Sequence, residues 1–511
     1  MRAGVIDIGS SSIKLIIGEK QDDDIKILSS LKNVVPIGKH AFLKGRIPQV
    51  VINQIVSVLE KYKQVLQEYE ITEPMVVATT AVREAQNKDI ILDTIRRKTG
   101  FQIEVFNIGD VIYYIDYCLS YKLKKTYPIR EKNLLIAELG AGSLDLSVLE
   151  KGLTLFNIGF PIGTLRLAQF MSQLDGSREE IYTAAQEYVE QEILSVKRIN
   201  PKFDIDDVIL IDETYSFYLQ NILPNKKRES NFFPFRQEEA AEFLSNLTER
   251  PPNEIKNDYK IPTDAAETIA GYALILNTLF KLTPNKYINI LEISLSEAIL
   301  ANMLFKFEIS EKDNKKQQLI SVANFLCRRY NMDIKHVQHV AKLSENLFQS
   351  FKELLGMEDK SLLYLLLAAY LHDIGSFINS RSHHKHSEYI INSLSLFRLT
   401  EEEINIIACI ARYHRKSRPM QSHILYNSLS SEKQILVQKL SAILRVANSL
   451  DRSHKQKVKK IELKVNRAQE LSLVVYTDQN FVLERANFFD KKELFEEITG
   501  NNLSLVIKSL S

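Results

Sequence analysis

The sequence predicts an α/β N-terminal half made of two similar lobes, followed by an all-α domain and a small α/β C-terminal domain. Three observations indicate this order. A strand that ends in an acid and a turn of small residues occurs near residue 7 and recurs near residue 138. Helical patterns with almost no proline run from 319 to 450, and nine of the ten histidines lie between His336 and His454. Alternating, strand-like patterning returns after residue 456.

Length and composition indicate a multidomain globular protein. The 511 residues exceed a single hydrophobic core, and 45% hydrophobic with 25% charged residues is ordinary. A net charge of +2 gives no general attraction to DNA or to a membrane. The three cysteines are widely spaced, and neither a secretory leader nor a membrane-length apolar run occurs. We therefore expect a cytoplasmic protein without disulfides.

The first acidic turn follows a β-rich run over residues 4–8, and a second strand resumes over 13–18. The turn consists of Gly9, Ser10, Ser11 and Ser12. Backbone N–H groups and short hydroxyls can hold phosphate oxygens, and Asp7 can hold a divalent cation. A plain hairpin with a serine-rich turn explains this stretch equally well.

Helices and strands then alternate. We predict a helix over 52–70, strands over 75–78 and 103–106, and a helix over 111–121. Arg83 follows two threonines at a strand end, where a guanidinium can bind phosphate in a fork. Taken alone, a surface or salt-bridge arginine is the simpler interpretation.

The acidic turn recurs within residues 133–148, where a strand again leads to an acid and a glycine-rich turn. The acid is Glu138, and the turn includes Gly140, Gly142 and Ser143. Two matching hairpins indicate an internal duplication around a phosphate cleft. Residues 216–305 are predicted to be helical and to complete the second lobe. The charged segment 309–318 is the predicted domain boundary, and a solvated helix start is equally compatible with it.

The histidine-rich domain contains an apolar helix that ends in His372 and Asp373. Both side chains are good ligands for a hard or borderline metal. A single histidine is more often a buried structural or a surface residue. We interpret four of them in this way: His383, His384, His423 and His454.

Four stretches, in their order and spacing, resemble the Ppx/GppA family of exopolyphosphatases and guanosine pentaphosphate phosphohydrolases. They are Asp7–Ser12, Ala78–Asn87, Glu138–Ser143 and Gly159–Leu167. The resemblance implies a phosphoanhydride hydrolase that acts on inorganic polyphosphate or a guanosine nucleotide, is cytoplasmic and forms a homodimer.

The resemblance also implies a domain order. Residues 1–125 and 126–307 would form the two lobes of an actin/Hsp70-like, ribonuclease H-like fold. Residues 317–455 would form an HD-type helical metal domain, and 456–511 the small α/β domain.

The family motifs further imply site residues. Arg83 and Asp110 would be catalytic, and Asp7 and Glu138 would hold Mg²⁺. The phosphate or nucleotide would contact Asp7, Gly9, Ser10, Ser11, Ser12, Arg83, Glu138, Gly140, Gly142 and Ser143. Asp110 follows from counting on from the 103–106 strand. Anchoring on Gly109 instead places Val111 and Ile112 at the positions of the family's glutamates.

Several motif positions depart from the family pattern. Ser11 replaces Asn, and the second hairpin has Glu138 for Asp, Ala141 for Gly, Leu144 for Thr and Asp145 for Glu. A Gly-Gly-Thr turn is replaced by residues 212–214, Asp-Glu-Thr, whose two acids would repel phosphate.

The order of the metal-binding side chains in the helical domain resembles the HD phosphohydrolase superfamily. The implied ligands are His336, His372, Asp373, His386, His414 and Asp451. A Val-Ala pair after three residues selects His336 over His339. Mixed imidazole and carboxylate ligands suit Mn, Fe, Zn or Co better than Mg alone.

Three hypotheses therefore remain open. The first is hydrolysis of polyphosphate or a guanosine pentaphosphate in the two-lobed cleft. The second is a metal-dependent HD phosphohydrolase, with the two-lobed domain sensing a nucleotide or phosphate. The third is a regulator without catalysis that binds nucleotide and metal.

Overall fold

The computed structural model describes residues 2–123, 126–199, 204–216, 218–223, 226, 232–282, 287–305, 311–394, 396, 399–415, 417–465 and 471–509. These residues form two compact units, Met1–Glu311 and Lys312–Ser511. Residues 124–125, at the predicted junction of the lobes, and 306–310, at the predicted domain boundary, lie outside the described residues.

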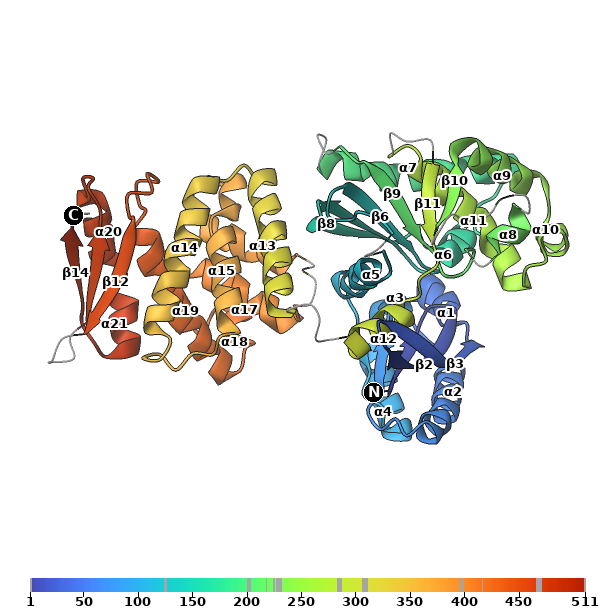
Figure 1. Ribbon diagram of the computed structural model, residues 1–511, viewed down its shortest axis with the longest axis horizontal. Helices are drawn as coiled ribbons and strands as arrows, with labels where there is room; N and C mark the ends of the chain where they lie inside the picture. The colour runs from blue at the N-terminus through green and yellow to red at the C-terminus, as the bar shows by residue number, and fades with distance from the viewer. Residues whose placement is uncertain are drawn as a thin grey trace. The chain divides into compact units, whose positions relative to one another are not determined.

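The first lobe is a five-stranded sheet in the order β3-β2-β1-β4-β5. Its strands are β1 (Arg2–Ile8), β2 (Ser12–Gln21), β3 (Asp24–Val34), β4 (Met75–Ala78) and β5 (Glu104–Val105). Its helices are α1 (Ile37–Lys44), α2 (Gln49–Glu68), α3 (Thr80–Glu84), α4 (Lys88–Thr99) and α5 (Ile108–Leu123). Apolar residues recur every three or four positions in α2, and Ile55 and Leu59 pack with Ile6 of β1 in one buried cluster. Figure 1 shows α2 beside the strands of this lobe.

The second lobe is a six-stranded sheet in the order β10-β11-β9-β6-β7-β8. Its strands are β6 (Asn133–Leu139), β7 (Leu144–Glu150), β8 (Leu153–Phe160), β9 (Asp207–Ile211), β10 (Phe233–Arg236) and β11 (Tyr287–Leu291). Its helices are α6 (Thr164–Met171), α7 (Arg178–Ile199), α8 (Leu219–Ile222), α9 (Gln237–Glu249), α10 (Pro252–Tyr259) and α11 (Thr263–Leu279). Both sheets begin with antiparallel strands and continue with parallel ones, so the fold repeats itself as the duplicated hairpins predict.

The prediction of an all-helical segment over 216–305 is wrong in two places. Strand β11 is a short buried run parallel to β9, and β10 pairs with its other side. Pro234 fits in β10 because this strand lies at the sheet edge, where a missing N–H is tolerated. Helix α12 (Leu295–Phe305) packs on β1 and β2, so this part of the predicted second lobe completes the core of the first.

The second unit begins with a bundle of helices. They are α13 (Glu311–Arg329), α14 (Ile334–Phe351), α15 (Ser361–Leu371), the 3-10 turn η1 (Ile374–Phe377), α16 (His383–Asn392), α17 (Glu401–Arg412), α18 (Ile424–Asn427) and α19 (Ser431–Ser449). Helix α15 is apolar almost all round, and α14, α17 and α19 surround it. Its buried position delivers His372, directly after its last residue, to the centre of the bundle.

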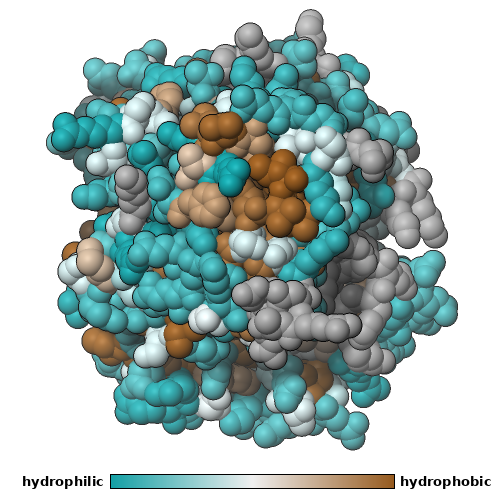
Figure 2. Space-filling view, turned by 90° about the vertical axis from the view of Figure 1, so that its left-hand side faces the viewer, coloured by the Kyte–Doolittle hydropathy of each residue, from teal (hydrophilic) through white to brown (hydrophobic). Residues whose placement is uncertain are grey.

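The chain ends in a three-stranded sheet with two helices. They are β12 (Lys460–Val465), β13 (Leu471–Tyr476), β14 (Leu503–Lys508), α20 (Val482–Lys491) and α21 (Glu493–Thr499). Figure 2 shows an apolar cluster bordered by polar atoms on the side of the molecule that carries these elements. The exposed large apolar side chains of this domain are Val482, Leu483, Phe489, Val506 and Ile507. They include no residue of the sites described below. Across the described parts of the chain, no helix has both the length and the apolar content of a membrane span.

Candidate functional site

Two turns with the same hydrogen-bond pattern line one pocket in the first unit. The N–H of Gly9 donates to the carbonyl of Ser12 at 3.0 Å, and that of Gly140 donates to Ser143 at 2.9 Å. In both hairpins an acid precedes the glycine by two residues. The pocket is lined by Asp7, Gly9, Ser10, Ser11, Ser12, Lys14, Thr79, Thr80, Val111, Glu138, Leu139, Gly140, Ala141, Gly142, Ser143, Asp145, Glu213, Thr214, Ile293 and Leu295. The structure thus brings together every predicted phosphate-binding residue except Arg83.

The two lobes approach closely at these turns, and glycine makes the approach possible. A Cβ at Gly142, in the turn of the second lobe, would lie 2.9 Å from the Ser10 hydroxyl in the turn of the first lobe. Arg166 adds a polar link between the lobes. It donates to Glu84 at 2.7 Å and lies 3.9 Å above the Phe42 ring.

Three carboxyl groups in the pocket resist ionisation. Burial raises the pKa of Asp7 to about 6, although Lys14 opposes the shift. Burial also raises the pKa of Asp145 to about 7, with Arg83 lowering it. The pKa of Glu138 is well above its ordinary value because of burial and then the neighbouring Asp145 and Asp7 carboxylates. Glu138 and Asp145 are direct partners across the β6–β7 ladder, so one of them keeps a proton near neutral pH.

The pocket has the donor atoms that a divalent cation needs. Asp7 Oδ1 and Asp145 Oδ1 are buried, and neither has a hydrogen-bond partner among the described residues. A Mg²⁺ bound at Asp7 would supply the missing partner of its Oδ1 atom and reduce the repulsion between the acids. The unpartnered Asp7 oxygen therefore fits the predicted Mg²⁺, with the predicted ligand Glu138 in the same pocket lining.

The two acids at 212–213 do not form the pair of phosphate-repelling charges that the sequence predicts. The Asp212 carboxylate accepts the backbone N–H groups of Thr214, Tyr215 and Ser216 and does not line the pocket. Glu213 does line it, and forms an ion pair with Lys14. One acid is thus engaged by its own turn, and the charge of the other is neutralised by a lysine that a phosphate could also attract.

The two predicted catalytic residues lie outside the pocket lining. Arg83 donates to the Phe106 carbonyl at 2.7 Å and to the Thr80 hydroxyl at 3.2 Å. Asp110 accepts the Asn107 N–H at 3.0 Å, while Asn107 accepts the Asp110 N–H, as in a helix cap. Val111 lines the pocket instead, which agrees with the alternative alignment anchored on Gly109. Asp145 stands where the family motif has a glutamate, and the sequence alone predicts no role for it.

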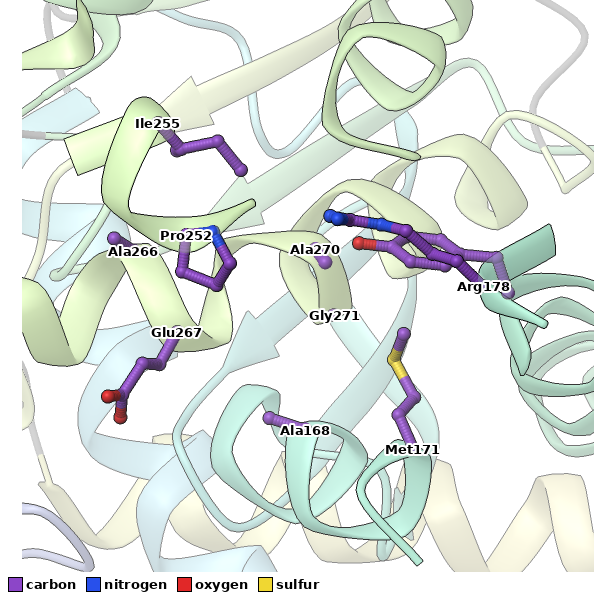
Figure 3. A pocket seen from close by; sticks show the side chains of 10 residues that line it. Ala168, Met171, Arg178, Pro252, Ile255, Ala266, Glu267, Ala270 and Gly271 are labelled. Atoms are coloured by element: carbon purple, nitrogen blue, oxygen red, sulfur yellow. The ribbon is translucent and has the colours of Figure 1, made fainter. Parts of the chain in front are cut away.

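A second hollow lies between α6, α7, α10 and α11, and Figure 3 shows its lining side chains. Arg178 is the only cation among the residues that line it. Its guanidinium donates to the carbonyls of Leu247 and Arg250 and lies 5.6 Å from the Tyr182 ring centroid. Because this cation is engaged by the chain itself, the hollow offers no phosphate site.

In the second unit, histidines converge on Asp373. Two groups of possible metal ligands share this residue: His336, His372 and Asp373, and Asp373, His383 and His414. Within each group all ligand atoms lie within 4.8 Å of one another. Burial opposes ionisation of Asp373, but the neighbouring imidazoles outweigh it and hold its pKa well below the ordinary value.

The structure differs from the predicted ligand set at two positions. His383, interpreted from the sequence as an ordinary histidine, lies 3.0 Å from Asp373, while the predicted His386 is in neither group. The Cβ of His386 faces the Gly375 backbone. Asp451 lies beside the ring of His336, with its Oδ2 atom 2.9 Å from Nδ1 of that ring, and is in neither group. From there it fixes the orientation of the imidazole.

Duplicated lobes with facing acidic turns define the class of this protein as a two-lobed, actin-like phosphate-binding fold. The chain matches the Ppx/GppA phosphatase family over residues 16–307, and domain III of Ppx/GppA phosphatases over residues 320–497. It belongs to the Ppx/GppA phosphatase family, as its motifs predicted. This membership confirms the predicted class of enzyme, a phosphohydrolase that acts on phosphoanhydride bonds.

Named relatives and solved structures agree with the family. The chain is 22% identical over 469 residues to a guanosine-5'-triphosphate,3'-diphosphate pyrophosphatase from Pseudoalteromonas translucida, covering 87% of this chain and 86% of that protein. It is 24% identical over 149 residues to exopolyphosphatase 1 of Mycobacterium tuberculosis, covering 29% and 42% of the two chains.

Two crystal structures share the fold. The Ppx/GppA family member from Aquifex aeolicus has a TM-score of 0.52 and 22% identity, covering 61% of this chain and 99% of that one. An exopolyphosphatase from Cytophaga hutchinsonii has a TM-score of 0.53 and 20% identity, covering 60% and 98%.

Proposed function

We propose that the cleft of the first unit hydrolyses the terminal phosphoanhydride bond of inorganic polyphosphate or of a guanosine pentaphosphate. One observation carries the proposal: both turns, with their serine side chains, line one pocket that also holds Asp7, Glu138 and Asp145. The named relatives act on substrates of this kind, and they support it. Chains of phosphate are strongly anionic, and backbone N–H groups, Lys14 and a divalent cation together match such a ligand.

Asp145 is the proposed general base. A pKa of about 7 lets its carboxylate accept a proton at neutral pH, and Asp145 lines the pocket in which the attacking water would bind. That water attacks the terminal phosphorus, its proton passes to Asp145, and the phosphoanhydride P–O bond breaks to release orthophosphate. The turns and Lys14 orient the phosphates, and Arg83 supports the Thr80 hydroxyl beside Ser143. Bound Mg²⁺ would neutralise phosphate oxygens.

A second candidate function is favoured by the histidines around Asp373. We propose that the helical domain holds Mn, Fe, Zn or Co through His336, His372 and Asp373, and that it acts as an HD-type phosphohydrolase on a nucleotide. Such a metal lowers the pKa of a bound water and polarises phosphate oxygens. Asp451 would orient His336 in this arrangement.

One experiment separates the two candidates. Phosphate release from polyphosphate, pppGpp and a nucleotide panel is measured with Mg²⁺ or Mn²⁺ for the wild type and two double variants. Loss of activity only in Glu138→Gln/Asp145→Asn is expected if the cleft is catalytic. Loss only in His372→Ala/Asp373→Ala would transfer the activity to the helical domain. A wild-type protein that binds these ligands tightly without turnover would overturn both and support a regulator.

The cleft also predicts a pH dependence of stability. Asp7 and Asp145 keep their protons up to about pH 6 and 7 in the folded chain but lose them near the ordinary value of 3.8 once unfolded. Between these values the folded state binds more protons, so this contribution to the free energy of unfolding falls as pH rises. Thermal unfolding in metal-free buffer from pH 4 to 8 should show the fall. It should be weaker in Asp7→Asn/Asp145→Asn, and Mg²⁺ should reduce it in the wild type.

Assembly stays a prediction from the family resemblance, and location stays a prediction from the sequence. We propose a cytoplasmic homodimer, and light scattering of the purified chain measures the oligomeric state directly.

A further inference from the structure

Helix α5 carries an acid within its buried apolar stripe. Val111, Ile112, Ile115 and Leu119 recur every three or four positions and are buried. Asp116 lies four positions after Ile112 and three before Leu119, so it belongs to the same stripe. A carboxyl group among apolar side chains is costly unless polar partners accompany it. The surface that α5 covers therefore needs polar groups opposite Asp116.

The strands under α5 carry such groups. The helix packs on β7 and β8, where Ser147 is directly opposite Asn157, and Asp145, two positions away, is opposite Gly159. Side chains two apart on a strand share a face, so Asp145, Ser147 and Asn157 point to one side of the sheet. This is the side of α5, because a Cβ at Gly159 would lie 2.5 Å from both Asp145 Oδ1 and the Cδ1 of Ile108, the first residue of the helix.

Four buried oxygen atoms at this interface have no hydrogen-bond partner among the described residues. They are Asp116 Oδ1, Asp145 Oδ1, Ser147 Oγ and Asn157 Oδ1. Folded proteins satisfy nearly all buried polar atoms, with ordered water where the chain supplies no partner. Carboxylate and amide oxygens accept hydrogen bonds, so water, which donates two, is a suitable partner. Asp145 and Ser147 are only 2% and 1% exposed, so such water would be internal.

The contacts along α5 place these groups in a row. Asp145 lies under the first residue of the helix, and Asp116 lies about two turns later, about 12 Å along the helix axis. There Asp116 forms a side-chain hydrogen bond with Thr154 of β8. Ser147 and Asn157 lie between the two ends, because the strand register puts them about 7 Å from Asp145 and Gly159. One or two water molecules span a gap of this size.

We propose that a chain of internal water molecules under α5 carries the proton released by each hydrolysis from Asp145 past Ser147 and Asn157 to Asp116, and from there to solvent. The inference rests on the proposed role of Asp145 as general base and adds the exit of its proton. Asp145 is suited to this role because it lines the pocket, while its Oδ1 atom faces α5.

The proton balance of one turnover is simple. The attacking water gives a proton to Asp145, which passes it to the first internal water. The Ser147 hydroxyl accepts one proton and donates its own, Asn157 holds the waters in place, and Asp116 receives the last proton. Asp116 is partly exposed and can release it to solvent, which leaves Asp145 ionised for the next turnover. Burial raises the pKa of Asp116 to about 8, so its carboxyl group can take up and release a proton near neutral pH.

Asp116→Asn tests the relay, because it keeps the size of the side chain and removes its proton transfer. Phosphate release by the full-length protein is measured with Mg²⁺ at pH 7 in dilute buffer, on polyphosphate or pppGpp, whichever the wild type hydrolyses. We expect kcat to fall by roughly tenfold with KM unchanged, and added imidazole, a small diffusible base, to restore it. Ser147→Ala should show the same loss, and Ser147→Thr, which returns a hydroxyl, should recover most of kcat.

The matched control is Ser120→Ala, on the exposed side of the same helix, which should keep the wild-type kcat. Thermal unfolding shows whether each variant is folded, and the two Ser147 variants carry the test if Asp116→Asn is not. A wild-type kcat in folded Asp116→Asn and Ser147→Ala, or a loss that imidazole does not restore, would overturn the relay and leave Asp145 as the base. An active Asp145→Asn would instead overturn the general base that the relay serves.

A high-resolution crystal structure of the wild type gives a measurement that does not depend on kinetics. Ordered water molecules should lie between Asp145 and Asp116, within hydrogen-bond distance of the Ser147 hydroxyl. A dry interface under α5 would overturn the relay.

Discussion

Replacing Asp145 by asparagine should reduce phosphate release from polyphosphate or pppGpp by roughly two to four orders of magnitude, the usual contribution of a positioned general base. The substitution keeps the size of the side chain and removes only its ability to take a proton. Asp145 is buried in the pocket lining with a pKa of about 7, so no other change of the cleft is expected. Substrate affinity should change much less than turnover, which single-turnover kinetics with Mg²⁺ can measure.

Asp110→Ala is the informative comparison, because the sequence alignment selects Asp110 for the same role. Its carboxylate accepts the Asn107 N–H at the start of α5, so we expect nearly unchanged turnover. Loss of the cap should destabilise the protein by about 1 kcal/mol. The opposite result, a severe loss in Asp110→Ala with an active Asp145→Asn, would identify Asp110 as the general base.

Replacing Asp373 by alanine should remove all bound transition metal from the helical domain. Both groups of possible metal ligands include Asp373, which supplies the carboxylate of each. Mass spectrometry of the reloaded variant should find no stoichiometric metal. In Mg²⁺-free buffer, a chelator should lower the melting temperature of the wild type and leave that of Asp373→Ala unchanged, because ligand binding stabilises by about 4 kcal/mol at a thousand times the dissociation constant.

His423→Ala serves as the control for this loss, since His423 contacts the Tyr413 hydroxyl at 2.7 Å and is in neither group of possible ligands. It should keep the metal and the chelator response of the wild type. An Asp373→Ala protein that still binds stoichiometric metal would contradict the role of Asp373 as a ligand.

The duplicated turns were predictable because they are local. An acid, a glycine and small hydroxyls between two strands determine their own conformation, and Asp7 through Ser12 and Glu138 through Ser143 lie where the sequence placed them. The role of Asp110 was not predictable in this way. Which residue of α5 faces the pocket depends on the helix start, and the reciprocal Asn107–Asp110 cap sets that start.

The choice among the histidines near Asp373 was also not predictable from the sequence. His383 and His386 are three residues apart on one helix, so their spacing alone does not separate them. The choice is made by the η1 turn, whose Gly375 packs against the backbone of His383 and the Cβ of His386. Strand β11 was missed for a related reason. Its five residues are short and apolar, and only pairing with β9 distinguishes them from part of a helix.

Helix α12 has a consequence for how the chain is made. Residues Ile299 and Leu300, nearly 300 positions from the start, pack in one buried cluster with Ala3 and Val5 of the opening strand. During synthesis, the apolar face of β1 therefore stays exposed until the whole second lobe and α12 have been synthesised. Contacts this distant in sequence slow folding and leave partly made chains prone to aggregation. The first lobe should consequently depend on chaperone protection on the ribosome, and a fragment that ends before α12 should precipitate when expressed alone.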